Sequence, residues 1–247
     1  MRRGAFPAAF SSAKEKTSFA LTSPLYGAAK YGIIILKSRN LMEESEKMDA
    51  AVYIHGKNGS AAEAKHYEPL LPSCDVIGLN YESSVPWAAG NEIHEAIRGL
   101  KANHDRIIVI ANSIGAFFSM HADIERDVCH AYFISPVVDM EKLIADMMRW
   151  ANVTESELQA KGSIQTAFGE VLSWEYLCYV RSHPIRWSVP TDILYGGRDS
   201  LTSIDTITSF AQKHHASLTV MESGEHWFHT EAQLRFLDEW IRQKNGN

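Results

Sequence analysis

The chain has 247 residues and a formal net charge of −6, from 24 Lys and Arg against 30 Asp and Glu. Its length and its hydrophobic fraction of 45% suit one globular α/β domain. The negative charge argues against nucleic acid and anionic membranes as partners, and no apolar run reaches the roughly 18 residues that a membrane span requires.

Residues 1–48 are predicted to form a poorly ordered N-terminal extension. Glu15 is the only acidic side chain before Glu43, so this basic, serine-containing segment resembles a transit peptide. Met48 directly precedes the first clear strand, which favours a dispensable extension instead. Within the segment, the apolar run at residues 32–36 fits either an edge strand or a helical turn.

The cysteines indicate the compartment. Cys74, Cys129 and Cys178 are scattered along the chain and have no metal-ligand spacing. An odd, scattered set is more typical of a reducing compartment than of a disulfide framework. We therefore expect a cytoplasmic localisation.

The ordered domain is predicted to span residues 49–247 and to begin with alternating strands and helices. Residues 50–54 form a short apolar run with the length of a buried strand. A capping box, with serine followed three positions later by glutamate, predicts a helix over residues 60–71. Residues 75–79 are the second predicted strand, and residues 86–102 the next helix, because their apolar positions recur at helical spacing.

The stretch RIIVIANSIGAFFSM combines a strand, a tight turn and a helix. Residues 107–111 are apolar and too few for a buried helix, while residues 116–120 read as helical. Ser113 stands at the apex of the turn, within the sequence ANSIG. This pattern is similar to G-x-S-x-G, the signature of a nucleophile elbow, with alanine at the first position. Alternatively, serine and glycine here only punctuate a strand-to-helix loop.

The middle of the chain has one further strand and then a long interruption. Residues 131–135 are the fourth predicted strand. Residues 136–187 show helical patterning, no clear strand, and the tryptophans Trp150, Trp174 and Trp187. A second capping box, TESE, supports at least one short helix in this stretch.

The last part of the chain returns to alternating strands and helices. Residues 191–195 and 217–221 are predicted strands, and each is followed by a glycine-containing turn. The helix between them, over residues 203–214, is expected to point Ile204, Ile207 and Phe210 inward. A third capping box, Thr230 with Gln233, opens a final helix with inward positions Leu234, Leu237, Trp240 and Ile241.

Three polar residues follow three of the predicted strands. Alternating strands and helices require crossover connections, so we expect a mostly parallel sheet with helices on both faces. The carboxyl ends of parallel strands meet at one edge, where ligands bind. Ser113, Asp199 and His226 all follow such ends and should therefore lie together.

At this point the chain resembles the α/β-hydrolase family. The resemblance covers residues 49–242 and follows the family's order of serine, then acid, then histidine. It rests on four motifs, namely HGKNGS at 55–60, ANSIGA at 111–116, YGGRDS at 195–200 and GEHWF at 224–228. The resemblance implies an α/β-hydrolase fold that needs neither a metal nor an organic cofactor.

The resemblance also implies a role for each site residue. Ser113 would attack an acyl carbonyl, and His226 would take the serine proton and deliver it to the leaving group. Asp199 would hold the imidazole in the required tautomer. The backbone N–H groups of Lys57 and Ile114 would form the oxyanion hole.

Many relatives carry a helical cap inserted before the strand that bears the acid, which corresponds to residues 136–187. Such a cap would supply an apolar pocket and exclude water. Trp150, Trp174 and Trp187 are candidate pocket residues on this reading. The alternative is that these tryptophans only pack the cap against the main domain.

Several residues compete for these roles. Asp139 follows the fourth strand and is a rival acid, whereas Asp192 begins its strand and so lies at the wrong end of the sheet. His229 is the rival base, but it sits immediately before the final helix. His214 lies next to His215, and His226 lies three residues before His229. Neither pair has a cysteine or carboxylate at zinc-site spacing, so we expect no metal.

The resulting hypothesis is a serine hydrolase that cleaves an ester or similar small acyl compound through an acyl-enzyme. A thioesterase, an amidase or aminopeptidase, an acyltransferase and a non-catalytic ligand-binding member of the fold remain open. Epoxide and haloalkane hydrolases are disfavoured because those relatives carry aspartate at the position of Ser113. The chain departs from the family at Ala111 and in having fewer predicted strands, and its oligomeric state stays open.

Overall fold

The computed structural model describes residues 47–246. The predicted extension over residues 1–48, apart from its last two residues, lies outside the described residues, as do residues 32–36. Within residues 47–246, no helix is both long and apolar enough to cross a membrane.

A parallel sheet of six strands forms the centre of the domain. Its order is β2-β1-β3-β4-β7-β8, and every neighbouring pair is parallel. The strands are β1 (Asp49–Ile54), β2 (Cys74–Gly78), β3 (Ile107–Asn112), β4 (His130–Ile134), β7 (Thr191–Gly196) and β8 (Ser217–Met221). Each lies within a residue or so of a strand predicted from a short apolar run, so the parallel α/β arrangement is confirmed.

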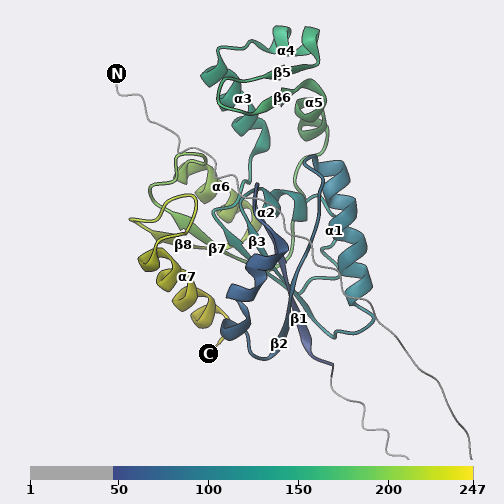
Figure 1. The fold of residues 1–247 in the computed structure, drawn as a ribbon, viewed down its shortest axis with the longest axis vertical. Helices are drawn as coiled ribbons and strands as arrows, with labels where there is room; N and C mark the ends of the chain where they lie inside the picture. The colour runs from purple at the N-terminus through teal and green to yellow at the C-terminus, as the bar shows by residue number, and fades with distance from the viewer. Residues whose placement is uncertain (1–46, 247) are drawn as a thin grey trace, which may run out of the picture. The chain divides into compact units, whose positions relative to one another are not determined.

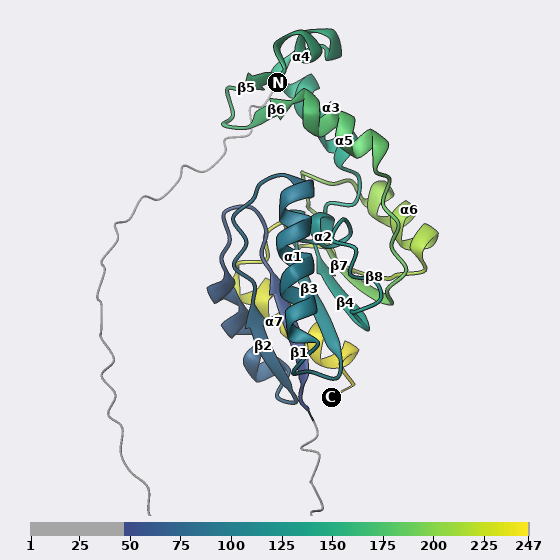
Figure 2. The ribbon, with the colours of Figure 1, turned by 90° about the vertical axis from the view of Figure 1, so that its right-hand side faces the viewer.

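Helices cover both faces of this sheet, as Figure 2 shows. On one face, alternate strand residues such as Val52 and Ile54 share a hydrophobic core with three helices. These helices are α1 (Pro86–Leu100), α2 (Ile114–Ser119) and α6 (Ile204–His214). On the other face, Ala51 and Tyr53 share a core with α7 (Glu231–Lys244). The alternation follows from the pleat of a strand, which points successive side chains to opposite faces.

The helix predicted over residues 60–71 is instead two short 3₁₀ turns, Ala61–His66 and Glu68–Leu70. The capping interaction is present, because the Glu63 carboxylate accepts from the Ser60 N–H at 3.0 Å. Pro69 lacks an N–H, however, and disfavours α conformation in the residue before it. The prediction of one continuous α-helix was therefore wrong.

The stretch between β4 and β7 forms a separate cap, drawn at the top of Figure 1. It contains α3 (Met140–Ala151), α4 (Glu155–Lys161) and α5 (Trp174–Ser182). It also contains an antiparallel pair, β5 (Ser163–Gln165) and β6 (Val171–Ser173), so the expectation of a cap without strands was wrong. Three-residue strands are too short to show a period of two in the sequence.

The cap is tied to the main domain by an aromatic contact and an ion pair. The ring of Trp87 on α1 lies 5.1 Å from that of Tyr179 on α5. The Lys57 ammonium, in the loop after β1, pairs with the Glu170 carboxylate in the cap. The loop after β1 therefore contacts both the cap and the sheet.

The inward faces of the last helices largely match the predicted pattern. On α6, Ile207 and Phe210 are buried, but Ile204 is 42% exposed, so its inward placement was wrong. Ile204 is the first residue of α6, directly after the N-cap Ser203, at the end of the helix. On α7, Leu237, Trp240 and Ile241 are buried, while Leu234 is half-buried and packs against the same core.

Candidate functional site

Ser113 occupies a strained turn between β3 and α2. Its φ of 53° and ψ of −118° lie in a region that residues with a side chain rarely adopt. The surrounding structure holds this conformation through three backbone hydrogen bonds. The Ser113 N–H donates to Ile134 at 3.0 Å, and its carbonyl accepts from Ala116 at 3.2 Å and Val137 at 3.1 Å. The side chain is thereby presented at the carboxyl edge of the sheet.

Two glycines let the chain approach closely around Ser113. A Cβ on Gly115 would lie 2.5 Å from the His55 carbonyl oxygen and 2.6 Å from that of Ile54. A Cβ on Gly56 would lie 3.1 Å from the Ser113 Cβ. The elbow therefore packs directly on the end of β1, and only glycine fits at residue 115 without displacing backbone.

A second close approach joins the loops that carry Asp199 and His226. A Cβ on Gly196, at the end of β7, would lie 2.4 Å from the Glu225 carbonyl oxygen. The Arg198 N–H donates to the Gly224 carbonyl at 2.8 Å. Backbone contact between these two loops therefore sets the spacing of the acid and the histidine.

Ser113, His226 and Asp199 form one chain of hydrogen bonds. Ser113 Oγ lies 2.8 Å from His226 Nε2, and His226 Nδ1 lies 2.7 Å from Asp199 Oδ2. Since a carboxylate can only accept, Nδ1 carries the proton and Nε2 is free to accept from the serine hydroxyl. The arrangement can therefore withdraw the serine proton as Oγ attacks an electrophile.

Asp199 is fixed more firmly than the histidine it faces. Its side chain is fully buried, at 0% exposed, against 23% for the His226 side chain. Its second oxygen, Oδ1, accepts from the Leu201 N–H at 2.7 Å and the Thr202 N–H at 3.1 Å. The carboxylate thus has a defined orientation, and it transmits that orientation to the imidazole.

The predicted oxyanion donors come from two segments that approach Ser113 closely. Ile114 is the first residue of α2, and Lys57 follows Gly56 in the loop after β1. Across residues 47–246, neither N–H has a hydrogen-bond acceptor. His55 has a structural place in that loop, because its carbonyl accepts from the Tyr81 hydroxyl at 2.7 Å and its ring stacks on that of Tyr81.

Two cavities meet beside this site and share Gly56, Lys57 and Asn58. The first, of about 530 Å³, lies beneath the cap, and we call it the cap cavity. Its apolar lining includes Ile114, Phe118, Met140, Ile144, Met147 and Leu172. The second, of about 440 Å³, we call the serine cavity. Its remaining lining residues are Gly59, Glu63, Asn112, Ser113, Leu201, His226 and Trp227.

The three tryptophans predicted to line the pocket lie elsewhere, and neither cavity includes them. Trp187 is buried, and its indole N–H donates to Thr191 Oγ1 at 2.8 Å. Trp150 is 53% exposed, and Trp174 packs partly buried against the core. The spacing of apolar residues does not say which face of a cap helix turns toward the sheet. On α3, Met140, Ile144 and Met147 line the cap cavity, where the tryptophans were expected.

Trp227 stands directly after His226 and also lines the serine cavity, although it was not predicted from the sequence. Its adjacency to the predicted base is the one signal in the sequence that could have identified it.

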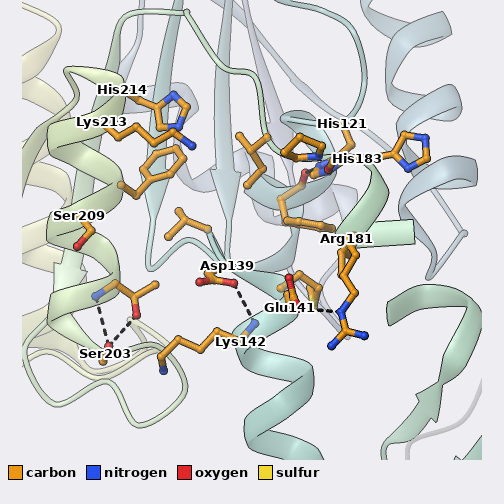
Figure 3. Close-up of a pocket in the computed structure, with 18 of the residues that line it drawn as sticks. His121, Asp139, Glu141, Lys142, Arg181, His183, Ser203, Ser209, Lys213 and His214 are labelled. Atoms are coloured by element: carbon orange, nitrogen blue, oxygen red, sulfur yellow. Dashed lines mark hydrogen bonds and ion pairs between the residues drawn. The ribbon is translucent and has the colours of Figure 1, made fainter. Parts of the chain in front are cut away.

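The rival acids lie apart from His226. Asp139 caps α3 by accepting from the Lys142 N–H at 2.9 Å. Figure 3 shows it in a third cavity, of about 600 Å³, with Lys142 and Arg181 nearby. Ser113 and His226 do not line that cavity. Asp192 lies at the amino end of β7, where it accepts from His130 and Lys244.

The rival base, His229, bonds to backbone, whereas His226 bonds to Ser113. His229 Nδ1 lies 2.8 Å from the carbonyl oxygen of Trp227. Over the described part of the chain, no group of three or more His, Cys, Asp or Glu side chains is placed to hold a metal ion.

The sequence matches no protein-family model and no curated protein, but solved structures resemble its fold. Est1E from Butyrivibrio proteoclasticus has a TM-score of 0.65 and 13% identity, over 82% of this chain and 89% of that one. Alpha/beta hydrolase domain-containing protein 10 from mouse has a TM-score of 0.63 and 15% identity, over 80% and 89%. The Pyrococcus furiosus esterase Pf2001 has a TM-score of 0.55 and 18% identity, over 81% of each chain. Together with the parallel sheet and the inserted cap, these likenesses show that the chain has the α/β-hydrolase fold.

Proposed function

We propose that this protein is a serine hydrolase that cleaves carboxylic esters through an acyl-enzyme. The observation that carries the proposal is the unbroken chain of hydrogen bonds from Ser113 through His226 to the buried Asp199. A serine on a strained turn, paired with a histidine that a carboxylate orients, is the arrangement that nucleophilic acyl transfer requires.

The proposed reaction has two halves. His226 Nε2 takes the proton of Ser113 Oγ as Oγ bonds to the ester carbonyl carbon, and the imidazolium then protonates the departing alkoxide. The negative oxygen between these events accepts from the Ile114 and Lys57 N–H groups. Water then attacks the acyl-enzyme with His226 again as base, which releases the acid and restores Ser113.

The cap cavity is the place proposed for the acyl group. Its apolar lining includes Ile144, Met147 and Leu172 from the cap together with Ile114, the residue after Ser113. Apolar acyl chains gain free energy by leaving water for such a lining. One of the similar structures is Est1E with ferulic acid, an aromatic acid, bound. Both aliphatic and aromatic acyl esters therefore belong in the first substrate panel.

The decisive experiment compares the wild-type protein with Ser113→Ala, using fluorophosphonate labelling and a panel of 4-nitrophenyl esters of graded chain length. The wild type should label and hydrolyse at least one ester, and Ser113→Ala should lose labelling and several orders of magnitude in kcat/KM. Ser209→Ala, which removes an exposed serine on α6, is the control and should behave as wild type.

The alternatives predict different results in the same panel. Thioesters and amides of matched acyl groups would distinguish a thioesterase or amidase, and an added alcohol acceptor would reveal an acyltransferase. Equal labelling of the wild type and Ser113→Ala would exclude Ser113 as the nucleophile. A folded wild type that neither labels nor turns over any substrate would indicate a ligand-binding member of the fold.

A further inference from the structure

Trp227 is a large aromatic side chain exposed beside the nucleophile. It is 67% exposed, the highest value among the large hydrophobic residues that the structure describes. Its neighbours in the serine cavity include Ser113 and His226 themselves. Leaving an indole in water forgoes the free energy that its burial would contribute. An exposed indole beside a reactive serine therefore indicates a surface that a ligand covers.

The indole is held in place on one side and open on the other. Its ring stacks on the ring of His229, with centroids 4.6 Å apart and planes at 21°. His229 is itself fixed, because its Nδ1 lies 2.8 Å from the Trp227 carbonyl oxygen and 3.7 Å from a Glu225 carboxylate oxygen. A ligand that stacks on the open face would therefore lose little free energy to ordering the side chain.

Beside Trp227, the serine cavity contains several polar side chains. It holds the carboxamides of Asn58 and Asn112 and the carboxylate of Glu63. Asn58 is exposed, and a carboxamide can both donate and accept hydrogen bonds. Glu63 accepts from Tyr53 at 2.6 Å and from Ser60 at 3.0 Å, and a carboxylate has further acceptor sites.

We propose that the serine cavity is the leaving-group subsite and that it takes a cyclic polyhydroxylated alcohol, such as a sugar, with Trp227 as its stacking surface. A sugar ring has one face of C–H groups, which packs on an indole, and an edge of hydroxyl groups, which amides and carboxylates bind. The polar groups of Asn58, Asn112 and Glu63 can form hydrogen bonds with the hydroxyl groups of a sugar that a purely apolar alcohol cannot form. This inference rests on the proposed hydrolase function and adds the class of alcohol to it.

The reaction at this subsite is the transfer already described. The bond from Ser113 Oγ to the carbonyl carbon forms, and the bond from that carbon to the sugar oxygen breaks. The proton that His226 took from Ser113 passes to the sugar oxygen, so the free sugar leaves with its hydroxyl restored. Water then hydrolyses the acyl-enzyme, and no other reactant is required.

The test uses butyrate esters that share one acyl group and differ only in the alcohol. We would measure kcat/KM for 6-O-butyryl glucose, ethyl butyrate and phenyl butyrate with the wild type, Trp227→Ala, Trp227→Phe and Trp150→Ala. Trp150 is the matched control, since it is 53% exposed but lies in the cap outside both cavities. For the sugar ester, Trp227→Ala should lose about tenfold or more, and Trp227→Phe should recover part of that loss.

For ethyl butyrate, kcat/KM of Trp227→Ala should stay within about twofold of the wild type, and Trp150→Ala should match the wild type on all three esters.

An equal loss of kcat/KM by Trp227→Ala on all three esters would overturn the inference, because it would show that Trp227 only supports the loop of His226. A loss confined to phenyl butyrate would overturn the sugar assignment in favour of an aromatic alcohol. If ethyl butyrate is hydrolysed and Trp227→Ala changes nothing, the inference fails while the hydrolase proposal stands. Failure of every ester, together with absent fluorophosphonate labelling, would instead refute the proposed function on which the inference rests.

Discussion

His226 and His229 follow the same strand, β8, but their imidazole rings have different hydrogen-bond partners. His226 bridges Ser113 and Asp199, whereas His229 bonds to backbone and supports the Trp227 ring. The difference arises because His226 lies in the loop that packs on Gly196, while His229 lies just before the cap of α7. At the scale of single residues, therefore, the start of α7 separates the histidine that bonds to Ser113 from the one that bonds to backbone.

This difference predicts opposite results for two alanine variants. His226→Ala should lose several orders of magnitude in kcat/KM for ethyl butyrate, because within residues 47–246 His226 is the hydrogen-bond partner of Ser113 Oγ that can take its proton. His229→Ala should keep activity on that ester within a few-fold of the wild type, since its ring does not contact the reacting atoms. Steady-state kinetics on both variants, with circular dichroism as the control for folding, would decide it. The reverse ranking would assign the base to His229.

The sequence predicted that Ser113, Asp199 and His226 lie together because each follows a strand of a parallel sheet, and the structure places them within hydrogen-bond distance of one another. It could not identify the residues of the cap cavity in the same way. A cap helix carries apolar residues on more than one face, and the sequence does not say which face packs on the main domain. The tryptophans were chosen for their size, yet Trp187 turned into the core and Trp150 toward solvent.

At the scale of elements, the strands were predictable and the connections less so. Strands of a parallel sheet are buried on both faces and read as continuous apolar runs. Short 3₁₀ turns and the three-residue strands β5 and β6 leave no such pattern, because their geometry depends on contacts from elsewhere in the fold. The elbow helix α2 was recognised from the turn that precedes it.

Two helical glycines provide a test of how closely α2 packs on β1. In isolation alanine is the better helix former, so Gly99→Ala in α1, where an added Cβ has no neighbour within 4 Å, should raise the free energy of unfolding by up to about 1 kcal/mol. Gly115→Ala should lower it by about 1–3 kcal/mol and also reduce kcat/KM, because its Cβ would push the elbow away from the His55 carbonyl.

Urea unfolding and ester hydrolysis, measured on both glycine variants, would test this. Comparable stabilisation by both alanines would mean that α2 can shift from β1 without cost. Retained activity in a destabilised Gly115→Ala would mean that the position of Ser113 does not depend on that contact.

At the scale of the whole molecule, the two ends of the sheet serve different purposes. The carboxyl end carries the strained turn, the two cavities and the cap. The amino end carries a cluster around Asp192, which accepts from His130 at 2.9 Å, from Lys244 at 2.6 Å and from Ser217. These partners come from β4, α7 and β8, so one carboxylate joins three elements to β7. Changes in this cluster should affect stability without affecting catalysis.

The pH dependence of unfolding tests this separation. Burial would raise the pKa of Asp192, but the hydrogen bonds and charge from His130, Lys244 and Ser217 outweigh it and hold the pKa well below its ordinary value. A carboxylate with a depressed folded pKa stabilises the fold above its unfolded pKa of about 3.9, and the contribution is lost as pH falls below that value. Asp192→Asn should therefore be less stable than the wild type by about 1–3 kcal/mol at pH 7. This difference in the free energy of unfolding should narrow as the pH falls toward 3, while kcat/KM at pH 7 stays unchanged.

Urea unfolding of both proteins between pH 3 and pH 7 would measure the difference. A difference that stays constant with pH would show that the charge of Asp192 contributes nothing to stability.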